Sequence, residues 1–220
     1  MFKALKMKNV IFAGALLLTL CLIGCRNETQ TDSQIRSEPE FTGYVLSGST
    51  ASPVRIEVFS DMQCPACSHL FVDVILPAMK EYQDNVNVVY YEFPLSGHNF
   101  SRPAARYIAA AAKLGQKHVL SVYDAIFNDQ AQWSMDGNLE ASVSRALSRE
   151  DFLKVLQILR DDDLLAEIDR SIENERLFGL RRGVESTPTM FVFYGDREQK
   201  VEGTMPYPVM KQFLDSFAKP

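Results

Sequence analysis

The sequence predicts an α/β domain interrupted by a helical insertion, and the order of its apolar segments carries this prediction. A strand-like run at 54–59 is followed by a helical pattern and then by a second buried strand-like run at 86–93. Strand, helix and strand in that order form a βαβ unit with parallel strands. A stretch of helical composition, about 101–180, separates this unit from a final strand pair. We therefore expect a central mixed β-sheet flanked by helices, with the insertion between its two halves.

The first half of the domain has one short strand ahead of the βαβ unit, at 41–46. The connecting helix is expected over 65–83, because apolar residues recur there at helical spacing. Pro77 falls inside this pattern and should kink the helix or end it early, since proline lacks the N–H that a helix interior requires.

The insertion is predicted to contain several helices. An alanine-rich run at 104–114 stops at Gly115, and a second helical run follows at 117–127. Another segment starts near Leu139, and Ser148 begins a capping signal for a helix that ends near residue 159. A last helical run covers 164–180. Its apolar stripes are interpreted as core, without a chemical role.

The second half reads as a hairpin and a closing helix. Residues 189–194 (TMFVFY) form a strand pattern, Asp196 and Arg197 form a turn, and 198–203 provide a partner strand. The closing helix is expected over 206–218.

Length and composition indicate one ordinary globular domain. The chain has 220 residues, of which 46% are hydrophobic and 23% charged, with a formal net charge of −5. This acidity argues against nucleic acid as a partner and against electrostatic attachment to an anionic lipid surface.

The N-terminus reads as an export signal. Residues 1–24 combine a basic start, an apolar core too short for a confident membrane span, and the sequence Leu-Ile-Gly ahead of Cys25. This ending resembles a bacterial lipobox, which implies that Cys25 is lipidated and becomes the mature N-terminus. An ordinary cleaved signal and an uncleaved anchor are the alternatives, and each version places the domain outside the cytoplasm. Residues 25–40 are polar and are interpreted as a flexible tether, so the domain is assigned to 41–220.

The chemistry is expected at Cys64-Pro65-Ala66-Cys67, because these are the only cysteines in the body of the chain. Two cysteines three residues apart at the start of a helix lie on one face, close enough to bond. Cys64 occupies the expected N-cap and Pro65 the first helical position. Free N–H groups and the helix dipole then favour a thiolate at Cys64, and a thiolate is the species that attacks disulfides.

A zinc half-site and a structural disulfide are the alternatives for this pair. A structural zinc needs four ligands, and neither a second CxxC pair nor a spaced histidine pair follows. A bridge across so small a loop would stabilise the fold little.

A second motif, GVESTPTMF at 183–191, precedes the final strand pair. Together with FSDMQCPAC and FPLSGHNFSRPAA it resembles the thioredoxin superfamily, and specifically its DsbA-like branch with an inserted helical region. The resemblance covers about 41–218 and implies a thioredoxin fold that needs no metal or organic cofactor.

The resemblance also implies roles for individual residues. Cys64 matches the exposed nucleophilic cysteine and Cys67 the buried resolving one. Pro188 matches the proline whose preceding peptide bond is cis, and Thr187 the residue whose backbone faces the disulfide and pairs with an extended substrate. Pro65 and Ala66 are the residues between the cysteines that shape the site.

Three departures from the branch bear on the chemistry. Val58 stands where an acid usually assists the resolving thiol in this branch. The neighbouring Glu57 is either brought to that place by a local bulge or is an exposed acid on the other face of its strand, and we expect the second. Ala66 stands where the strongest oxidants have histidine. Asp61 is a nearby negative charge that should raise a thiol pKa.

Four other residues of reactive or aromatic type are given no catalytic role. His69 is expected at the surface or half-buried, turned away from the cysteines, and Trp133 is expected to be a packing residue. His98 and Arg102 belong, with Pro103, to a loop that matches the family in sequence, and we assign that loop no role beyond its shape.

The sequence therefore predicts a lipid-anchored, extracytoplasmic thiol–disulfide oxidoreductase, on the periplasmic side or cell surface of a bacterial membrane. It would oxidise client protein dithiols and be re-oxidised by a quinone-linked membrane partner, which the family implies. A reductase or isomerase using the same pair is the alternative among enzymes. A thioredoxin-fold lipoprotein that binds a soft metal, or acts as a chaperone, is the alternative from another class.

Overall fold

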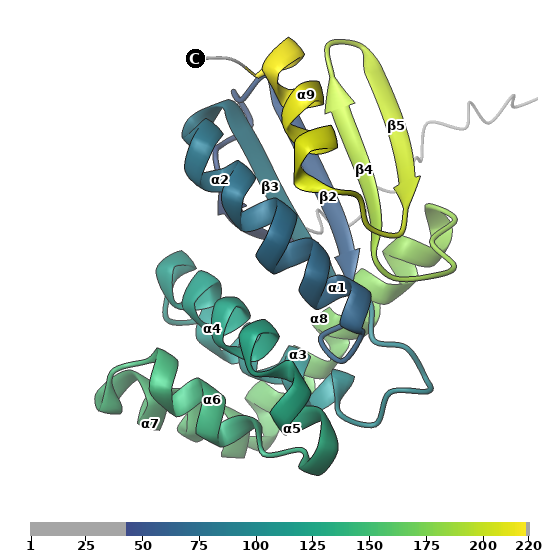
Figure 1. Cartoon of the computed structure of the whole chain (residues 1–220). Coiled ribbons are helices and arrows are strands. Elements are labelled where there is room, and N and C mark those ends of the chain that lie inside the picture. The colour runs from purple at the N-terminus through teal and green to yellow at the C-terminus, as the bar shows by residue number, and fades with distance from the viewer. Residues whose placement is uncertain (1–42, 219–220) are drawn as a thin grey trace, which may run out of the picture. The chain divides into compact units, whose positions relative to one another are not determined.

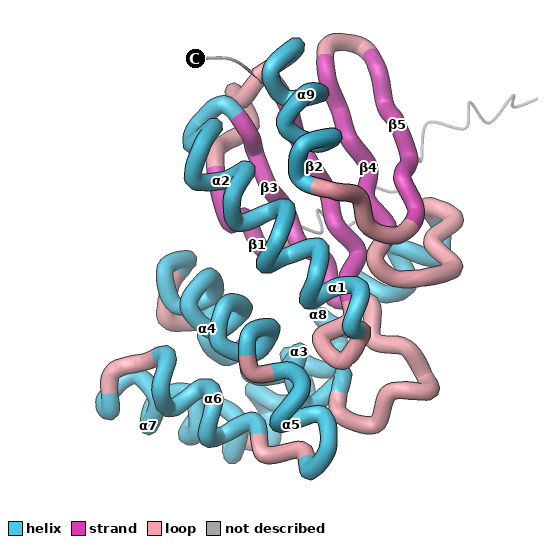
Figure 2. Tube along the Cα trace, viewed as in Figure 1, coloured by secondary structure: helices cyan, strands magenta, loops and turns pink. Residues whose placement is uncertain are grey.

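The computed structural model describes residues 43–218. The predicted signal peptide at 1–24, the lipidation site Cys25 and the tether at 25–40 lie outside the described residues. Within the described range a mixed sheet has the strand order β1-β3-β2-β4-β5 (Figure 1; Figure 2). The strands are β1 Tyr44–Ser47, β2 Val54–Ser60, β3 Val86–Glu92, β4 Thr189–Tyr194 and β5 Arg197–Glu202.

The strand pairing has the mixed character that the sequence predicts. β2 and β3 are parallel, while β1 with β3, β2 with β4 and β4 with β5 are antiparallel. The predicted βαβ unit and C-terminal hairpin are therefore confirmed. β4 coincides with the predicted strand at 189–194.

The helix that joins β2 to β3 runs through its proline. α1 Pro65–Leu70 leads into a π-helical turn, Phe71–Ile75, and then into α2 Leu76–Tyr82. The π-helical turn ends just before Pro77. Hydrogen bonds in a π-helical turn join residues five apart, so the pairing of backbone groups changes ahead of Pro77. The N–H that proline lacks is then not required there. The helix is thus interrupted near Pro77, as predicted, but continues to Tyr82 instead of ending there.

The insertion contains six helices among the described residues. They are α3 Ser101–Ala112, α4 Gln116–Asn128, α5 Gln130–Asp136, α6 Leu139–Ala146, α7 Arg149–Arg160 and α8 Asp162–Arg181. The predicted cap of α7 is present, because the Ser148 hydroxyl accepts the N–H of Asp151 at 3.1 Å. The short helix α5 was not expected from the sequence pattern. In Figure 1 the helices α3 to α7 gather beyond the end of the sheet at which β2 leads into α1.

Helices cover both faces of the sheet. α1, α2 and α9 Tyr207–Phe217 lie over one face, where the largest apolar cluster includes Val58, Tyr90 and Cys67. The other face carries a cluster in which Phe59, Val89 and Phe191 pack with Phe178 of α8. Within residues 43–218 no helix is both long and apolar enough to cross a membrane.

Candidate active site

The end of β2 delivers both cysteines to the start of α1. Cys64 is the N-cap, with extended backbone at φ −76° and ψ 119°, and Pro65 occupies the first turn. The Cys64 carbonyl oxygen accepts the N–H of Cys67 at 3.0 Å and that of Ser68 at 3.2 Å. Both cysteines are free thiols in this structure. The cap and proline positions expected from the sequence are confirmed.

The environment of Cys64 favours its thiolate. A hydrogen bond from the Cys67 thiol contributes most and lowers the pKa of Cys64 to about 5, against an opposing effect of burial. The Thr187 hydroxyl and the backbone N–H groups of Cys67 and Ala66 lower the pKa further. These N–H groups belong to the first turn of the helix, next to the Cys64 sulfur.

The environment of Cys67 favours its thiol. Its side chain lies in the apolar cluster and the residue is 1% exposed. Burial raises the pKa of Cys67, and the neighbouring Cys64 raises it further. The backbone N–H of Asp61, 3.4 Å from the Cys67 sulfur, and the Ser60 hydroxyl act in the opposite direction. The two cysteines therefore differ strongly in acidity although they stand one turn apart.

The segment before β4 closes the site from the other side. The Thr187–Pro188 peptide bond is cis, as the resemblance implies. The Cys64 thiol donates to the Thr187 carbonyl oxygen at 3.4 Å. The Thr189 hydroxyl holds the turn by donating to the carbonyl oxygen of Ser186 at 2.7 Å. The structure thus brings the two sequence motifs together, with the Thr187 backbone facing Cys64.

The Asp61 carboxylate accepts hydrogen bonds from the residues around it. The carboxylate is fully buried and accepts the N–H groups of Gln63 and Leu95, each at 2.7 Å, and the Ser101 hydroxyl at 2.5 Å. His98 lies 3.1 Å from the same carboxylate. The sequence-based expectation that Asp61 raises a thiol pKa is not met, because the group that it presents to Cys67 is its N–H.

The burial of Glu57 differs from the prediction made from the sequence. Glu57 was expected to be exposed, yet it is 4% exposed. Its carboxylate lies 3.1 Å from Arg182 and 3.4 Å from Arg55, because the α8 end of the insertion covers this face of the sheet. Val58, one residue on, packs in the cluster that holds Cys67. Glu57 is therefore turned away from the cysteines, as its strand position indicates.

The predictions for His69 and Trp133 are confirmed. The His69 side chain is exposed and pairs with Asp73 at 2.5 Å. Trp133 is fully buried, and its indole N–H donates to the carbonyl oxygen of Ile126 at 2.7 Å.

Sequence reasoning missed Gln130, which supports the active-site loop from the insertion. Its side-chain amide donates to the carbonyl oxygens of Met62 at 2.8 Å and Cys64 at 3.0 Å. No local pattern marks this residue. The one available signal is that Gln130 is a polar residue at the start of a helix, between two apolar runs. Gln130 links the position of Cys64 to the packing of α5.

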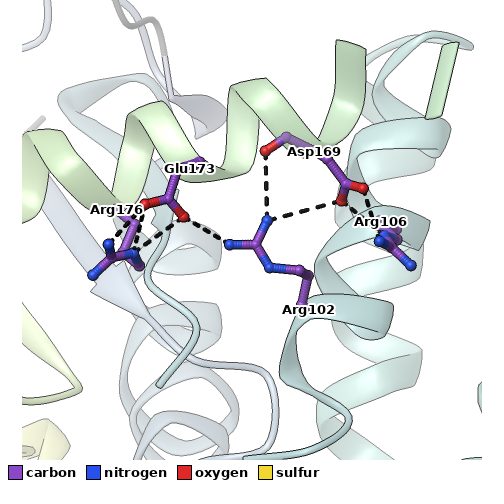
Figure 3. A network of polar contacts seen from close by, with 5 residues as sticks. All are labelled: Arg102, Arg106, Asp169, Glu173 and Arg176. Atoms are coloured by element: carbon purple, nitrogen blue, oxygen red, sulfur yellow. Dashed lines mark hydrogen bonds and ion pairs between the residues drawn. The ribbon is translucent and has the colours of Figure 1, made fainter. Parts of the chain in front are cut away.

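A cavity of about 830 Å³ lies beside the segment that leads to the cis bond. Its wall runs from Phe93 along the following loop to α3 and α8, and it reaches Val184 and Glu185. Figure 3 shows the ion-pair network of this wall, in which Arg102 of α3 stands between Asp169 and Glu173 of α8. Arg106 adds a two-pronged contact with Asp169, at 2.7 and 2.8 Å. The network fixes α3 against α8 and so holds the shape of the cavity.

The described part of the chain, residues 43–218, contains no group of three or more His, Cys, Asp or Glu side chains placed to hold a metal ion. These groups form an asymmetric dithiol: an acidic Cys64, a weakly acidic Cys67, and a backbone carbonyl that faces Cys64. The exposed position that the resemblance implies for Cys64 is not found, because Cys64 is only 8% exposed and packs in the same apolar cluster as Cys67.

Comparison with known proteins points the same way. The family model described as Thioredoxin matches residues 42–216. A protein of Bacillus cereus named probable disulfide bond formation protein D is 25% identical over 151 residues, which are 66% of this chain and 68% of that protein.

Solved structures of similar fold include DsbA2 of Pseudomonas aeruginosa, which is 25% identical. It has a TM-score of 0.58, with 78% of this chain and 93% of that chain covered. BdbD of Bacillus subtilis, in its oxidised form, is 18% identical with a TM-score of 0.63, covering 80% of this chain and 92% of that chain. The thiol–disulfide exchange protein alpha-DsbA2 of Wolbachia pipientis is 23% identical with a TM-score of 0.62, covering 77% and 84%. The chain therefore belongs to the thioredoxin family, as a DsbA-like thiol–disulfide oxidoreductase.

Proposed function

We propose that this protein oxidises client dithiols to disulfides through Cys64 and Cys67. The observation that supports this direction most is the acidity of Cys64, whose pKa is lowered to about 5. Stabilising the thiolate stabilises the reduced enzyme, and a stable reduced form makes the disulfide a stronger oxidant. The name of the Bacillus cereus relative, a disulfide bond formation protein, agrees with this direction.

The reaction begins with the Cys64–Cys67 disulfide. A client thiolate attacks the Cys64 sulfur, the bond between the two cysteines breaks, and its electron pair leaves on the Cys67 sulfur. A second client thiolate then attacks the client sulfur of the mixed disulfide, and Cys64 leaves as its stabilised thiolate. The client gains one disulfide, and the enzyme is reduced by two electrons.

The segment around the cis bond is proposed to hold the client. The Thr187 backbone faces Cys64 and would pair with an extended client segment in the manner of an added strand. Pro65 and Ala66 shape the entrance between the cysteines. Cys64 is 8% exposed and Cys67 is 1% exposed, so the client is proposed to reach Cys64 first.

The oxidation of client dithiols would take place outside the cytoplasm, at a membrane. Lipidation of Cys25 would anchor the protein, the polar tether at 25–40 would give the domain reach, and a quinone-linked membrane partner would accept the electrons. A globomycin-sensitive shift in the mobility of the full chain would support lipidation at Cys25, and its absence together with a soluble mature form would refute it.

The decisive experiment for the direction is the reduction potential of the Cys64–Cys67 pair, measured by equilibration in glutathione buffers. We expect a value well above that of thioredoxin, with each ~30 mV corresponding to ~1.4 kcal/mol. A thioredoxin-like value would reassign the protein as a reductase or isomerase that uses the same residues.

A trapping experiment tests the roles of the two cysteines. The Cys67→Ser variant is expected to accumulate mixed disulfides with clients through Cys64, and the matched Cys64→Ser variant is expected to accumulate none. A chaperone would bind clients equally in both variants and form no covalent adduct.

A further inference from the structure

The loop that follows β3 resembles the family in sequence but has no part in the disulfide exchange described above. It forms one wall of the cavity of about 830 Å³, through Phe93, Leu95 and His98 among others. α3 and α8 supply further wall residues, and the segment before the cis bond contributes Val184 and Glu185. The cavity therefore lies between the helical insertion and the segment that completes the active site.

Hydrogen bonds fix this loop to the turn that leads to Cys64. The Leu95 N–H donates to the Asp61 carboxylate at 2.7 Å, and the Phe100 N–H donates to the side-chain carbonyl oxygen of Gln63 at 2.8 Å. Asp61 and Gln63 both lie between β2 and α1. The loop wall of the cavity is thus held in a fixed position relative to the reactive sulfur.

The opposite wall is continuous with the backbone that faces this sulfur. Glu185 precedes Thr187 by two residues, a separation of at most about 7 Å along the chain. The Thr187 carbonyl oxygen lies 3.4 Å from the Cys64 sulfur. A client segment that pairs with the Thr187 backbone in extended form therefore passes the cavity two or three residues from its own cysteine.

The cavity presents apolar surface to a ligand. Phe93 and Val184 line it and are buried, and Leu95 is partly buried. Leu180 of α8 also lines it and is 46% exposed. A ligand that removes such surface from water gains free energy in proportion to the apolar area that it covers.

The charged side chains of the cavity wall are paired with one another. Figure 3 shows Arg102 and Arg176 on either side of Glu173, and each arginine lies 2.7 Å from its carboxylate. An acidic ligand would have to compete with Glu173 for these arginines and would also meet the exposed Glu185. A basic ligand would meet the two arginines. This balance favours an uncharged ligand, and the alkyl stems of the arginines add to the apolar surface.

The expected clients supply such a ligand. Cysteine is among the residues most often buried in folded proteins, together with the large aliphatic residues and phenylalanine. In a client that has not yet folded, the residues next to a cysteine therefore include apolar side chains that are still exposed to water.

We propose that this cavity receives a large aliphatic or aromatic side chain of the client, two or three residues from the cysteine that reacts with Cys64. The inference rests on the client oxidation proposed above and adds to it a preference for clients with such flanking residues. It gives the loop after β3 and Leu180 of α8 a role in recognition, although neither contacts the cysteines.

The test is the rate at which the oxidised enzyme oxidises a series of dithiol peptides. The peptides differ at one position, two or three residues before or after the first cysteine, where they carry leucine, phenylalanine, serine, aspartate or lysine. Each second-order rate constant is divided by the constant for the same peptide with glutathione disulfide, which removes differences in thiol reactivity. On one side of the cysteine, leucine and phenylalanine should be preferred to serine by about tenfold.

Substitutions of two exposed leucines locate the preference. Leu180→Ser should reduce the ratio of the leucine constant to the serine constant to below about twofold, and Leu180→Met should retain it. Leu153→Ser is the matched control, because Leu153 lies on α7, is 54% exposed and does not line the cavity. It should keep the wild-type constants for every peptide. Both positions are exposed, so these variants should fold.

The possible failures are distinguishable. Equal constants for the leucine and serine peptides, or a preference that Leu180→Ser leaves intact, would refute the assignment of the cavity while client oxidation stands. A preference for aspartate that Arg176→Gln removes would also overturn it, in favour of an acidic ligand. If the wild-type enzyme oxidises none of the peptides, the proposed function itself fails.

Discussion

The Cys64 thiol and the Thr187 carbonyl oxygen lie 3.4 Å apart, although 123 residues separate them in the chain. Cys64 begins α1 and Thr187 precedes β4, which pairs with β2 at the centre of the sheet. The surroundings of the reactive sulfur are therefore completed by a segment that follows the whole insertion in the sequence. The environment of the thiolate is a property of the folded domain, and it can be changed from the Thr187 side without touching either cysteine.

Replacing Thr187 with valine should raise the pKa of Cys64 from about 5, because the Thr187 hydroxyl is one of the groups that lower it. A higher thiolate energy makes the enzyme a weaker oxidant. The ultraviolet absorbance of the thiolate, followed as a function of pH, measures the shift. Thr187→Ser keeps the hydroxyl and should keep the wild-type value. An unchanged titration in Thr187→Val would show that the hydroxyl does not act on the sulfur.

The contribution of Cys64 to the stability of the reduced protein should increase between about pH 5 and pH 9. The pKa of Cys64 is about 5 in the folded state and close to its usual value of 9.0 in the unfolded chain. A group whose pKa is lowered by folding contributes stability that is fully present above the unfolded pKa, and is lost as the pH falls toward the folded one. Cys67, whose pKa is raised, acts in the opposite sense and only above this window.

Urea unfolding of the reduced protein at several pH values checks this expectation, with Cys64→Ala as the reference. The difference in unfolding free energy between the two proteins should grow as the pH rises through the window. A constant difference would contradict the assignment of an acidic Cys64.

Local signals in the sequence were enough for the elements that position the site. The helix start at Cys64-Pro65, the cap at Ser148 and the strand at 189–194 all depend on neighbours within a few residues, and the structure reproduces them. The π-helical turn before Pro77 is the exception. Proline signals a break in a helix, but the wider turn that lets the helix continue depends on how both flanking segments pack on the sheet.

The contacts that tune the site were beyond sequence reasoning, because their partners are distant. Gln130 reaches the carbonyl of Met62 across 68 residues, and Glu92 meets Glu175 across 83. Asp61 carries the negative charge on which the sequence-based expectation depends. Its carboxylate, however, accepts hydrogen bonds from Leu95 in the loop after β3 and from Ser101 in α3. Glu57 was misjudged for the same reason, since Arg182 covers it from the end of α8.

Gly179 lies where α8 packs against the rings of Phe59 and Phe93. A Cβ atom there would stand 2.7 Å from a ring carbon of Phe93 and 2.8 Å from one of Phe59. Gly179→Ala should therefore destabilise the protein by about 1–3 kcal/mol, as an overpacked core does. Gly97→Ala is the matched control, because no atom lies within 4 Å of its Cβ position, and its effect should stay within about 0.5 kcal/mol. Equal stability of the two variants in urea unfolding would mean that α8 moves away from the aromatic cluster at little cost.

The last prediction concerns the ion pair between Arg182 and Glu57, on the face of the sheet that α8 covers. Arg182 lies 3.1 Å from the buried carboxylate of Glu57, 2.7 Å from Glu198, and 4.0 Å from the ring centre of Phe191. Arg182→Ala should lower the unfolding free energy by about 2 kcal/mol, because a buried carboxylate then keeps only the longer contact with Arg55.

Removing both charges with Glu57→Met and Arg182→Met should be less damaging than Arg182→Ala, since no buried charge is left unpaired. Urea unfolding of the single and double variants measures this coupling. The rate of client oxidation should stay at the wild-type level in every folded variant of this set, because Glu57 faces away from the cysteines. A loss of rate in parallel with the loss of pairing would instead connect this face of the sheet to the reacting thiols.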